Sequence, residues 1–204
     1  MHPNPAFARE ERQRNISFLR DRAFGTLAIN GPDGPLTAHV PFLLDTSGDT
    51  AELHLVRSTA IARAIRSDAS CVITVTGPDS YVSPDWYGVA DQVPTWNYVA
   101  ICLRGQLVPM PHDDLHAVLD RLFEHFERRL LPKHPWHSNK MPDGAMEKMM
   151  KSILPFQIDV TSIEGRWELG QNKPDAARRS GADGIAAYGQ GQEIATLAAL
   201  MRGA

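Results

Sequence analysis

Apolar and polar residues alternate in three short runs near the start of the chain, and a few turn-forming residues separate each run from the next. The runs cover residues 24–29, 36–44 and 51–56, with turn segments at 31–34 and 45–49. Proline presets φ and glycine tolerates positive φ, so these segments favour tight turns. Strands joined by such short turns pair antiparallel. The pattern therefore predicts an antiparallel sheet and favours a barrel over a doubly wound fold.

The rest of the chain predicts further strands and several flanking helices. Strands are expected at residues 71–76, 97–108 and 156–163, and helices at residues 10–20, 58–67, 113–130, 142–154 and 192–202. Residues 77–94 are rich in Gly, Pro, Asp and aromatic residues, which favours an irregular loop. We expect one domain over residues 1–204, with the barrel and its helices in 1–170 and a polar segment with a short helix in 171–204.

The composition is that of an ordinary globular chain, and the charge and motifs reduce the number of function classes to consider. The formal net charge is −3, so binding to DNA would need a local basic patch, and the C-terminal region offers the basic step Arg178-Arg179. The sequence has no G-x-G-x-x-G, P-loop, H-E-x-x-H or C-x-x-C motif. Cys71 and Cys102 lie in apolar runs and are expected to be buried free thiols. With no signal peptide or membrane span in the pattern, we predict a cytoplasmic protein.

Two pairs of histidines are candidate metal ligands. His112 and His116 stand four residues apart at the start of a helix, where spacing offers no suitable third ligand. His134 and His137 flank a tryptophan in a loop that is more typical of a surface. We therefore predict no metal site.

Residue types suited to a phosphate follow the third strand. His54 lies on that strand, and Arg57, Ser58 and Thr59 end it where a short helix begins. A forked cation, short hydroxyl donors and the positive end of a helix dipole are the groups that bind a phosphate dianion. The same residues could equally form a helix N-cap beside an exposed arginine. Spacing alone leaves both interpretations open.

Two aromatic strings lie close together later in the chain. Residues 81–87 read Y-V-S-P-D-W-Y and residues 93–98 read V-P-T-W-N-Y. Their rings could stack on a planar heterocycle, or they could form a packed cover over the barrel or a dimer surface. Taken by themselves, the strings favour the packed cover or the dimer surface over a ligand contact.

These strings also carry a family resemblance. The second is the full V-P-T-W-N-Y string of PaiB-like proteins, and the first resembles their Y-I-S-P-S-W-Y. Residues 24–27, 38–44 and 163–173 resemble further segments of that family. The chain thus resembles the PaiB-type FMN-binding negative transcriptional regulators over most of its length.

Three departures from the family pattern are visible. Residues 58–60 read Ser-Thr-Ala where the family has A-N-P, although His54 and Arg57 before them are retained. Cys102 replaces a histidine, and Gly170 replaces a serine.

The resemblance implies a mainly β fold with flanking helices, a split β-barrel of the FMN-binding, pyridoxamine-phosphate-oxidase-like kind that forms a homodimer. It implies that FMN lies at the dimer interface, with its phosphate on Arg57, Ser58 and Thr59. The remaining implied contacts are Thr37, Ala38, His39 and Val40 along the isoalloxazine, His54 beside the phosphate residues, Trp86, Trp96 and Tyr98 as walls, and Gln171 and Lys173 near the ring or ribityl chain.

The family role implies DNA or a regulatory protein as a partner, although no helix-turn-helix pattern or basic stripe supports direct DNA binding. Two other functions stay open. One is an FMN-dependent oxidoreductase or flavin reductase that uses NAD(P)H. The other is a split barrel that binds haem through His39 or His54, or that binds no cofactor. No catalytic residue is assigned.

Overall fold

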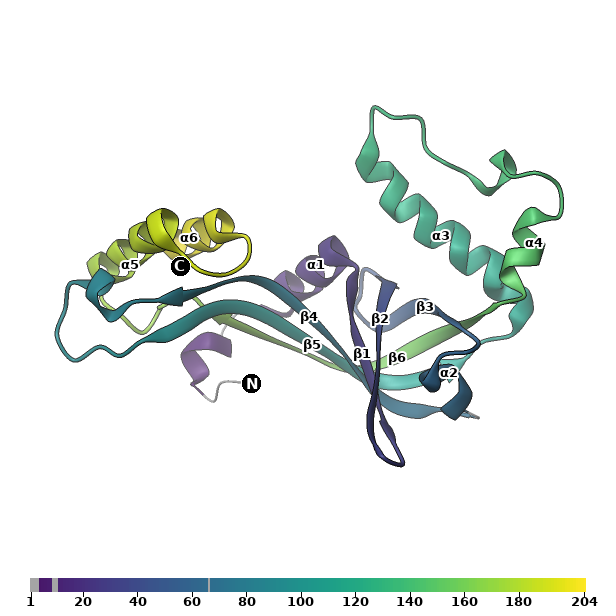
Figure 1. Cartoon of the computed structure of the whole chain (residues 1–204), viewed down its shortest axis with the longest axis horizontal. Coiled ribbons are helices and arrows are strands. Elements are labelled where there is room, and N and C mark those ends of the chain that lie inside the picture. Colours follow the sequence, from purple (N-terminus) through teal and green to yellow (C-terminus); the bar gives the residue numbers. More distant parts are fainter. Residues whose placement is uncertain (1–3, 9–10, 66) are drawn as a thin grey trace. The chain divides into compact units, whose positions relative to one another are not determined.

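The computed structural model describes residues 4–8, 11–65 and 67–204, and its described strands form a closed six-stranded barrel (Figure 1). In barrel order the strands are β1 (Phe24–Gly31), β2 (Gly34–Leu44), β3 (Thr50–Val56), β6 (Ile153–Glu168), β5 (Thr95–Pro109) and β4 (Ala69–Val82). The α-helices are α1 (Arg12–Arg22), α2 (Ala60–Ala64), α3 (Leu115–Glu127), α4 (Ala145–Met150), α5 (Asp175–Tyr188) and α6 (Ile194–Gly203). The 3₁₀ helices are η1 (Pro5–Ala8), η2 (Pro84–Tyr87), η3 (His112–Asp114), η4 (Arg128–Leu130) and η5 (Ser138–Lys140). The expectation of a mainly β barrel with flanking helices is confirmed.

The chain divides into two compact units. The barrel unit comprises Ile16–Thr74 and Cys102–Ile163, and the terminal unit comprises Met1–Asn15, Val75–Ile101 and Glu164–Ala204. Strands β4, β5 and β6 contribute residues to both units. The expectation of a single domain over 1–204 stays a prediction.

In the barrel unit, the alternation of apolar residues builds the core. β1 and β2 form an antiparallel hairpin from Phe24↔Pro41 to Gly31↔Gly34, and β3 pairs antiparallel with β6. Inward residues such as Leu27, Phe42 and Leu53 are fully buried. Each side chain of this size contributes about 1.5–3 kcal/mol when it leaves water. A second, smaller cluster forms under α3 and α4 around Leu115, Leu119 and Met146.

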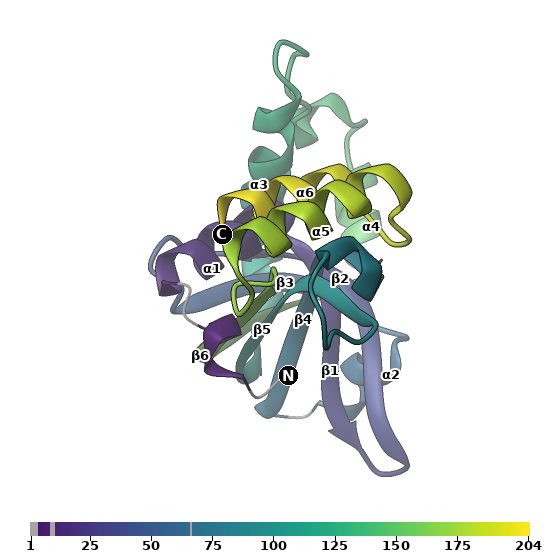
Figure 2. The same cartoon turned by 90° about the vertical axis from the view of Figure 1, so that its left-hand side faces the viewer.

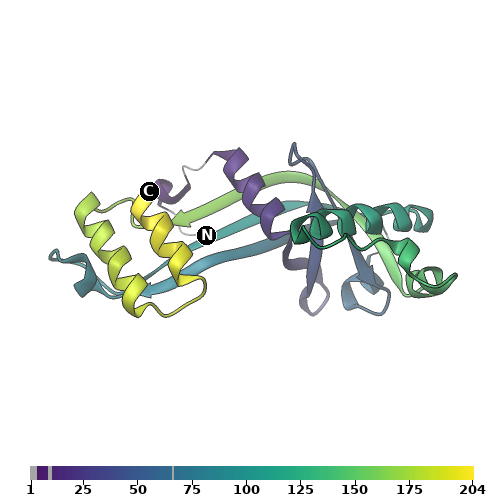
Figure 3. The same cartoon turned by 90° about the horizontal axis from the view of Figure 1, so that it is seen from above.

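In the terminal unit, α5 and α6 pack side by side over the outer residues of β4 and β5 (Figure 2 and Figure 3). Two glycines let α5 approach η2 closely: a Cβ at Gly181 would lie 2.7 Å from the Tyr87 ring, and one at Gly184 would lie 2.4 Å from Cγ of Trp86. These contacts explain why a helix forms in a glycine-containing stretch. Among the described residues, no helix is both long and apolar enough to cross a bilayer.

Several expected boundaries were wrong. Residues 77–82 belong to β4 and are not a loop, because Asp79 and Tyr81 donate backbone hydrogen bonds to Gln192 and Gln190, each at 3.0 Å. The expected polar segment after residue 171 contains the whole of α5. The helix expected at 142–154 is shorter, since β6 already begins at Ile153.

Candidate functional site

The residues between β3 and α2 form a small polar corner, which we call the phosphate corner (Arg57–Thr59). Arg57 is exposed and anchored, because its backbone N–H donates to Ser152 O at 2.9 Å and its Nε donates to Lys151 O at 2.7 Å. The Nε bond leaves the two terminal nitrogens of the guanidinium able to donate to an anion. Ser58 is exposed beside it. The corner therefore offers a fixed cation and a hydroxyl donor.

Thr59 has a structural role that the spacing had left open. Its hydroxyl donates to Val56 O at 2.9 Å and accepts from Ala62 N at 3.3 Å, so it is the N-cap of α2. The expected helix ends at Ala64, before Ser67, and five residues give a weak dipole. The expected help from a helix dipole is thus small, and Arg57 and Ser58 carry the anion-binding capacity of the corner.

Strand β2 lies next to the corner, since α2 contacts it. Thr37 and His39 are exposed on one face, Ala38 is half-buried, and Val40 is 2% exposed in the core. The ladder between β2 and β3 runs through Phe42–Leu44, so Thr37–Val40 lie beyond it. Alternate backbone groups of an antiparallel strand point to each edge. Thr37 and His39 can therefore contact a ligand with side chains, whereas Ala38 and Val40 can do so through the backbone.

His54 precedes the corner on β3, where it pairs with Pro155. Its Nδ1 is buried and has no hydrogen-bond partner among the described residues. Burial lowers the pKa of His54, so the neutral imidazole is favoured. A buried polar atom without a hydrogen-bond partner is uncommon in a protein core. It is expected where a polar group of a ligand, or a water molecule, supplies the missing hydrogen bond.

These features fit an FMN-like ligand. A phosphate needs the cation and hydroxyl that Arg57 and Ser58 present, and a polar ring system needs an open strand edge such as that of Thr37–Val40. The residues of the barrel unit are therefore suited to the cofactor that the sequence resemblance implies.

The aromatic residues of the predicted set lie in the terminal unit. Trp86 packs against Tyr81 and Tyr188, with ring centroids 6.5 Å apart in each case. Trp96 is 49% exposed and Tyr98 is half-buried, both on β5. Trp86 thus takes part in a packed aromatic cover, and its contact with a flavin stays a prediction, as do those of Trp96 and Tyr98.

Gln171 and Lys173 also lie in the terminal unit, in the turn after β6. Gln171 accepts from Leu169 N at 2.9 Å and donates to Trp167 O, which closes the turn. Gly170 has φ +80° there, a conformation that favours glycine over the serine of the family pattern. Lys173 donates to Gln92, and its Nζ lies 4.2 Å from the centroid of the Tyr87 ring. Both side chains therefore already stabilise this unit.

The electrostatics of that contact follow from burial. Burial lowers the pKa of Lys173, with a smaller opposing effect of Glu168. Burial also raises the pKa of Tyr87 to about 12, so the phenol stays protonated. The cation thus lies over a neutral aromatic ring, which is the arrangement of a cation–π interaction.

A pocket that we did not anticipate from the sequence lies beside Lys173. It has a volume of about 200 Å³. Its lining includes Thr95 and Asn97 of the V-P-T-W-N-Y string, and Gly170 and Asn172 of the family-like segment 163–173. The family resemblance of both 93–98 and 163–173 was the available signal, but no spacing rule brings residue 97 next to residue 172.

The histidine pairs show no metal geometry. His116 Nδ1 pairs with Asp120 at 3.0 Å, and His112 Nε2 lies 3.3 Å from Met150 O. In the described part of the chain, no group of three His, Cys, Asp or Glu side chains is arranged to hold a metal ion. Cys71 and Cys102 are buried free thiols, as expected, and burial raises the pKa of Cys71 to about 11.

The basic step near the C-terminus is largely neutralised. Arg178 is buried and, like Arg179, forms an ion pair with Asp175. These two arginines therefore do not form an exposed patch for a nucleic-acid backbone.

The fold and this site define a split β-barrel protein of the FMN-binding kind. Residues 1–162 match the protein family described as "Putative FMN-binding domain", and the chain belongs to that family. Protease synthase and sporulation protein PAI 2 of Bacillus subtilis strain 168 is 26% identical over 159 residues, which is 77% of this chain and 75% of that protein. The resemblance to PaiB-type proteins is thereby confirmed.

Solved structures support the fold. The FAD and heme binding protein of Mycobacterium smegmatis has a TM-score of 0.57 at 19% identity and covers 89% of this chain and 80% of its own. A flavocytochrome of Azotobacter vinelandii has a TM-score of 0.52 at 13% identity, over 82% and 72% of the two chains. At these identities the likeness is one of fold alone.

Proposed function

We propose that this protein binds FMN through its barrel unit and acts as a PaiB-type negative transcriptional regulator in the cytoplasm. The observation that carries the proposal is the anchored, exposed guanidinium of Arg57 next to Ser58 and the open edge of Thr37–Val40. Membership of the FMN-binding family and similarity to a protein named for sporulation support it.

The chain's own residues have distinct roles in this proposal. Lys151 O holds the Arg57 side chain so that its terminal nitrogens meet the phosphate, and Ser58 donates a second hydrogen bond. Thr59 fixes the direction of the chain by capping α2. Thr37–Val40 follow the ring system, and the neutral His54 offers a nitrogen to a polar group of the ligand. Bound FMN would supply reversible electron transfer.

The test is a titration of flavin-free protein with FMN, followed by flavin fluorescence. Hydrogen bonds from a charged group to phosphate contribute about 1.5–3 kcal/mol, so Arg57→Ala should raise the Kd for FMN about 10- to 100-fold. Arg63→Ala is the matched control, because Arg63 is an exposed arginine at the other end of α2. Equal affinity of wild type and Arg57→Ala would contradict the proposed phosphate site.

The regulatory part has its own experiment. A gel shift with genomic fragments at physiological salt tests direct DNA binding, because salt suppresses nonspecific association. A sequence-selective shift would support direct repression. Its absence, together with capture of a specific regulatory protein, would assign the role to a protein partner.

The two other functions have separate readouts on the same sample. An FMN-dependent oxidoreductase or flavin reductase would show rapid flavin reduction by NADH or NADPH in stopped-flow absorbance. Haem bound through His39 or His54 would show a Soret band. Either result would replace regulation as the leading function.

A further inference from the structure

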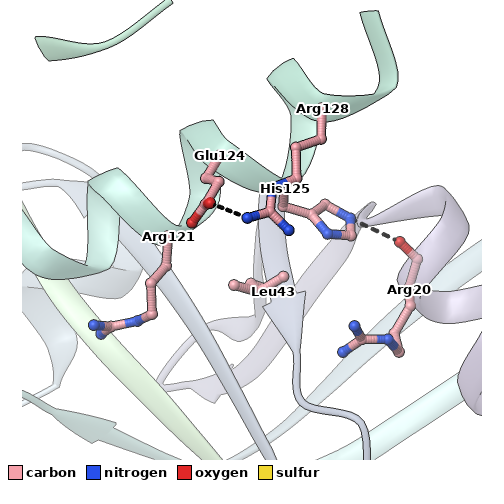
Figure 4. Close-up of a pocket in the computed structure, with 6 residues that line it drawn as sticks. All are labelled: Arg20, Leu43, Arg121, Glu124, His125 and Arg128. Carbon is pink, nitrogen blue, oxygen red and sulfur yellow. Dashed lines mark hydrogen bonds and ion pairs between the residues drawn. The ribbon is translucent and has the colours of Figure 1, made fainter. Parts of the chain in front are cut away.

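The barrel unit also has a pocket, distinct from the phosphate corner. It has a volume of about 400 Å³ and is lined by Arg20, Leu43, Arg121, Glu124, His125 and Arg128 (Figure 4). Arg20 lies near the end of α1, Leu43 on β2, and the other lining residues on α3 or immediately after it.

The α3 residues of the pocket form one face of the helix. Positions 121, 124, 125 and 128 follow the i, i+3, i+4, i+7 spacing that places side chains on a common stripe. The opposite stripe, which includes Leu115 and Leu122, is buried. A charged stripe of this kind is commonly a solvated face, but here Arg20 and Leu43 lie across from it and complete a pocket (Figure 4).

Each guanidinium in the pocket is oriented by one acceptor of the protein. Arg121 donates to Glu52 at 2.8 and 2.7 Å, Arg128 pairs with Glu124, and Arg20 donates to the carbonyl of Leu44. A guanidinium has five N–H donors, so each of these arginines keeps further donors for a ligand. The side chains are therefore held in place without being used up.

His125 and Arg129 fix the position of α3 against α1. His125 Nε2 lies 3.0 Å from Arg20 O, and Arg129 Nη2 lies 2.7 Å from the same carbonyl, so both side chains approach the last turn of α1. Burial and the nearby charge of Arg129 lower the pKa of His125 and favour its neutral form. The pocket charges are then three guanidiniums against the carboxylates of Glu124 and Glu52, a positive excess.

We propose that this pocket binds a small organic dianion of the dicarboxylate class. Arg20 and Arg121 come from different elements and lie on either side of Leu43 in Figure 4. Two forked cations separated by an apolar side chain match a ligand with two carboxylates joined by a short hydrocarbon. Arg128 supplies the third cation from above the same space.

This site is separate from the proposed flavin site. Leu43 lies three residues beyond Val40 on β2, which is about 10 Å along a strand. No residue of the phosphate corner lines the pocket. Binding of the dianion therefore does not depend on the proposal for FMN.

The test measures succinate binding to the full chain by isothermal titration calorimetry, with butyrate as the probe that has the same carbon chain and one carboxylate. We expect saturable binding of succinate and at least about tenfold weaker binding of butyrate, because one ion-paired group is missing. Arg128→Gln should weaken succinate binding about tenfold or more. Its side chain is 72% exposed, so the variant is expected to fold.

Two further variants separate this proposal from others. Arg63→Gln removes the same charge from an exposed position outside the pocket and should leave succinate binding unchanged. Arg57→Ala should lose FMN affinity and keep succinate affinity. The proposal is overturned by the absence of saturation at about 10 mM succinate, where a millimolar Kd would already show. It is also overturned by equal losses in Arg128→Gln and Arg63→Gln, or by a loss in Arg57→Ala alone.

Discussion

Arg57, Ser58 and Thr59 have different roles in the phosphate corner. Arg57 can offer its terminal guanidinium nitrogens to an anion, because its Nε already donates to Lys151 O. The structure gives the cap to Thr59, through its bonds to Val56 and Ala62. Ser58, which replaces a nonpolar residue of the family pattern, remains exposed and adds a donor.

His54 provides a prediction about pH. Because burial lowers the pKa of His54, the folded protein binds fewer protons there than the unfolded chain does. Above the ordinary histidine pKa of about 6.5, His54 is neutral in both states and does not lower the free energy of unfolding. As the pH falls below that value, the unfolded chain takes up the proton more readily than the folded protein, so the free energy of unfolding falls. His54→Gln should therefore reduce the fall in unfolding free energy between about pH 7.5 and 5.5, by at most about 1.4 kcal/mol per pH unit.

Urea denaturation at several pH values measures this effect. His134→Gln removes an exposed imidazole and should leave the wild-type pH dependence intact. A His54→Gln variant with the wild-type pH dependence would show that His54 does not resist protonation in the folded protein.

At the scale of elements, β1, β2 and β3 were accessible from the sequence because consecutive strands among them pair through short turns. The β1–β2 hairpin is an example, with Gly34 at φ +124° in its turn. The second half of β4 was not accessible, since Asp79 and Tyr81 also donate backbone hydrogen bonds to Gln192 and Gln190, more than one hundred residues away. The pocket proposed to bind a dianion was not accessible either, because Arg20 and Arg121, which both line it, are about one hundred residues apart in the sequence.

Helix α5 was not predicted from the sequence, because its formation depends on tertiary packing. Gly181 and Gly184 lower its intrinsic helix propensity, by about 1 kcal/mol each relative to alanine. In the tertiary structure these glycines allow the helix backbone to approach the rings of Tyr87 and Trp86, which a sequence does not show. Packing therefore decides the conformation of this segment.

This packing yields a prediction with an internal control. Gly184→Ala improves helix propensity but places a Cβ 2.4 Å from Trp86, so we expect a net destabilisation of about 1–3 kcal/mol. Gly203→Ala makes the same change in α6, where no heavy atom lies within 4 Å of the added Cβ, and should alter stability by less than about 0.5 kcal/mol. Urea denaturation of both variants decides the matter, and equal stabilities would refute the close approach of α5 to η2.

At the scale of the whole molecule, the proposal of a homodimer leads to a prediction about mass. Multi-angle light scattering should give about 45 kDa, twice the 22.6 kDa of one chain. The reason to expect a dimer is the family resemblance, which places FMN between two copies. A mass of one chain at micromolar concentration, with FMN present, would contradict it.

FMN binding itself is the central claim, and an absorption spectrum tests it most directly. The purified protein would be measured as isolated, and again after addition of excess FMN and desalting. The account predicts flavin absorption bands near one FMN per chain that persist after desalting in the wild type. A colourless protein after desalting would contradict the claim and leave a split barrel whose phosphate corner does not hold the cofactor.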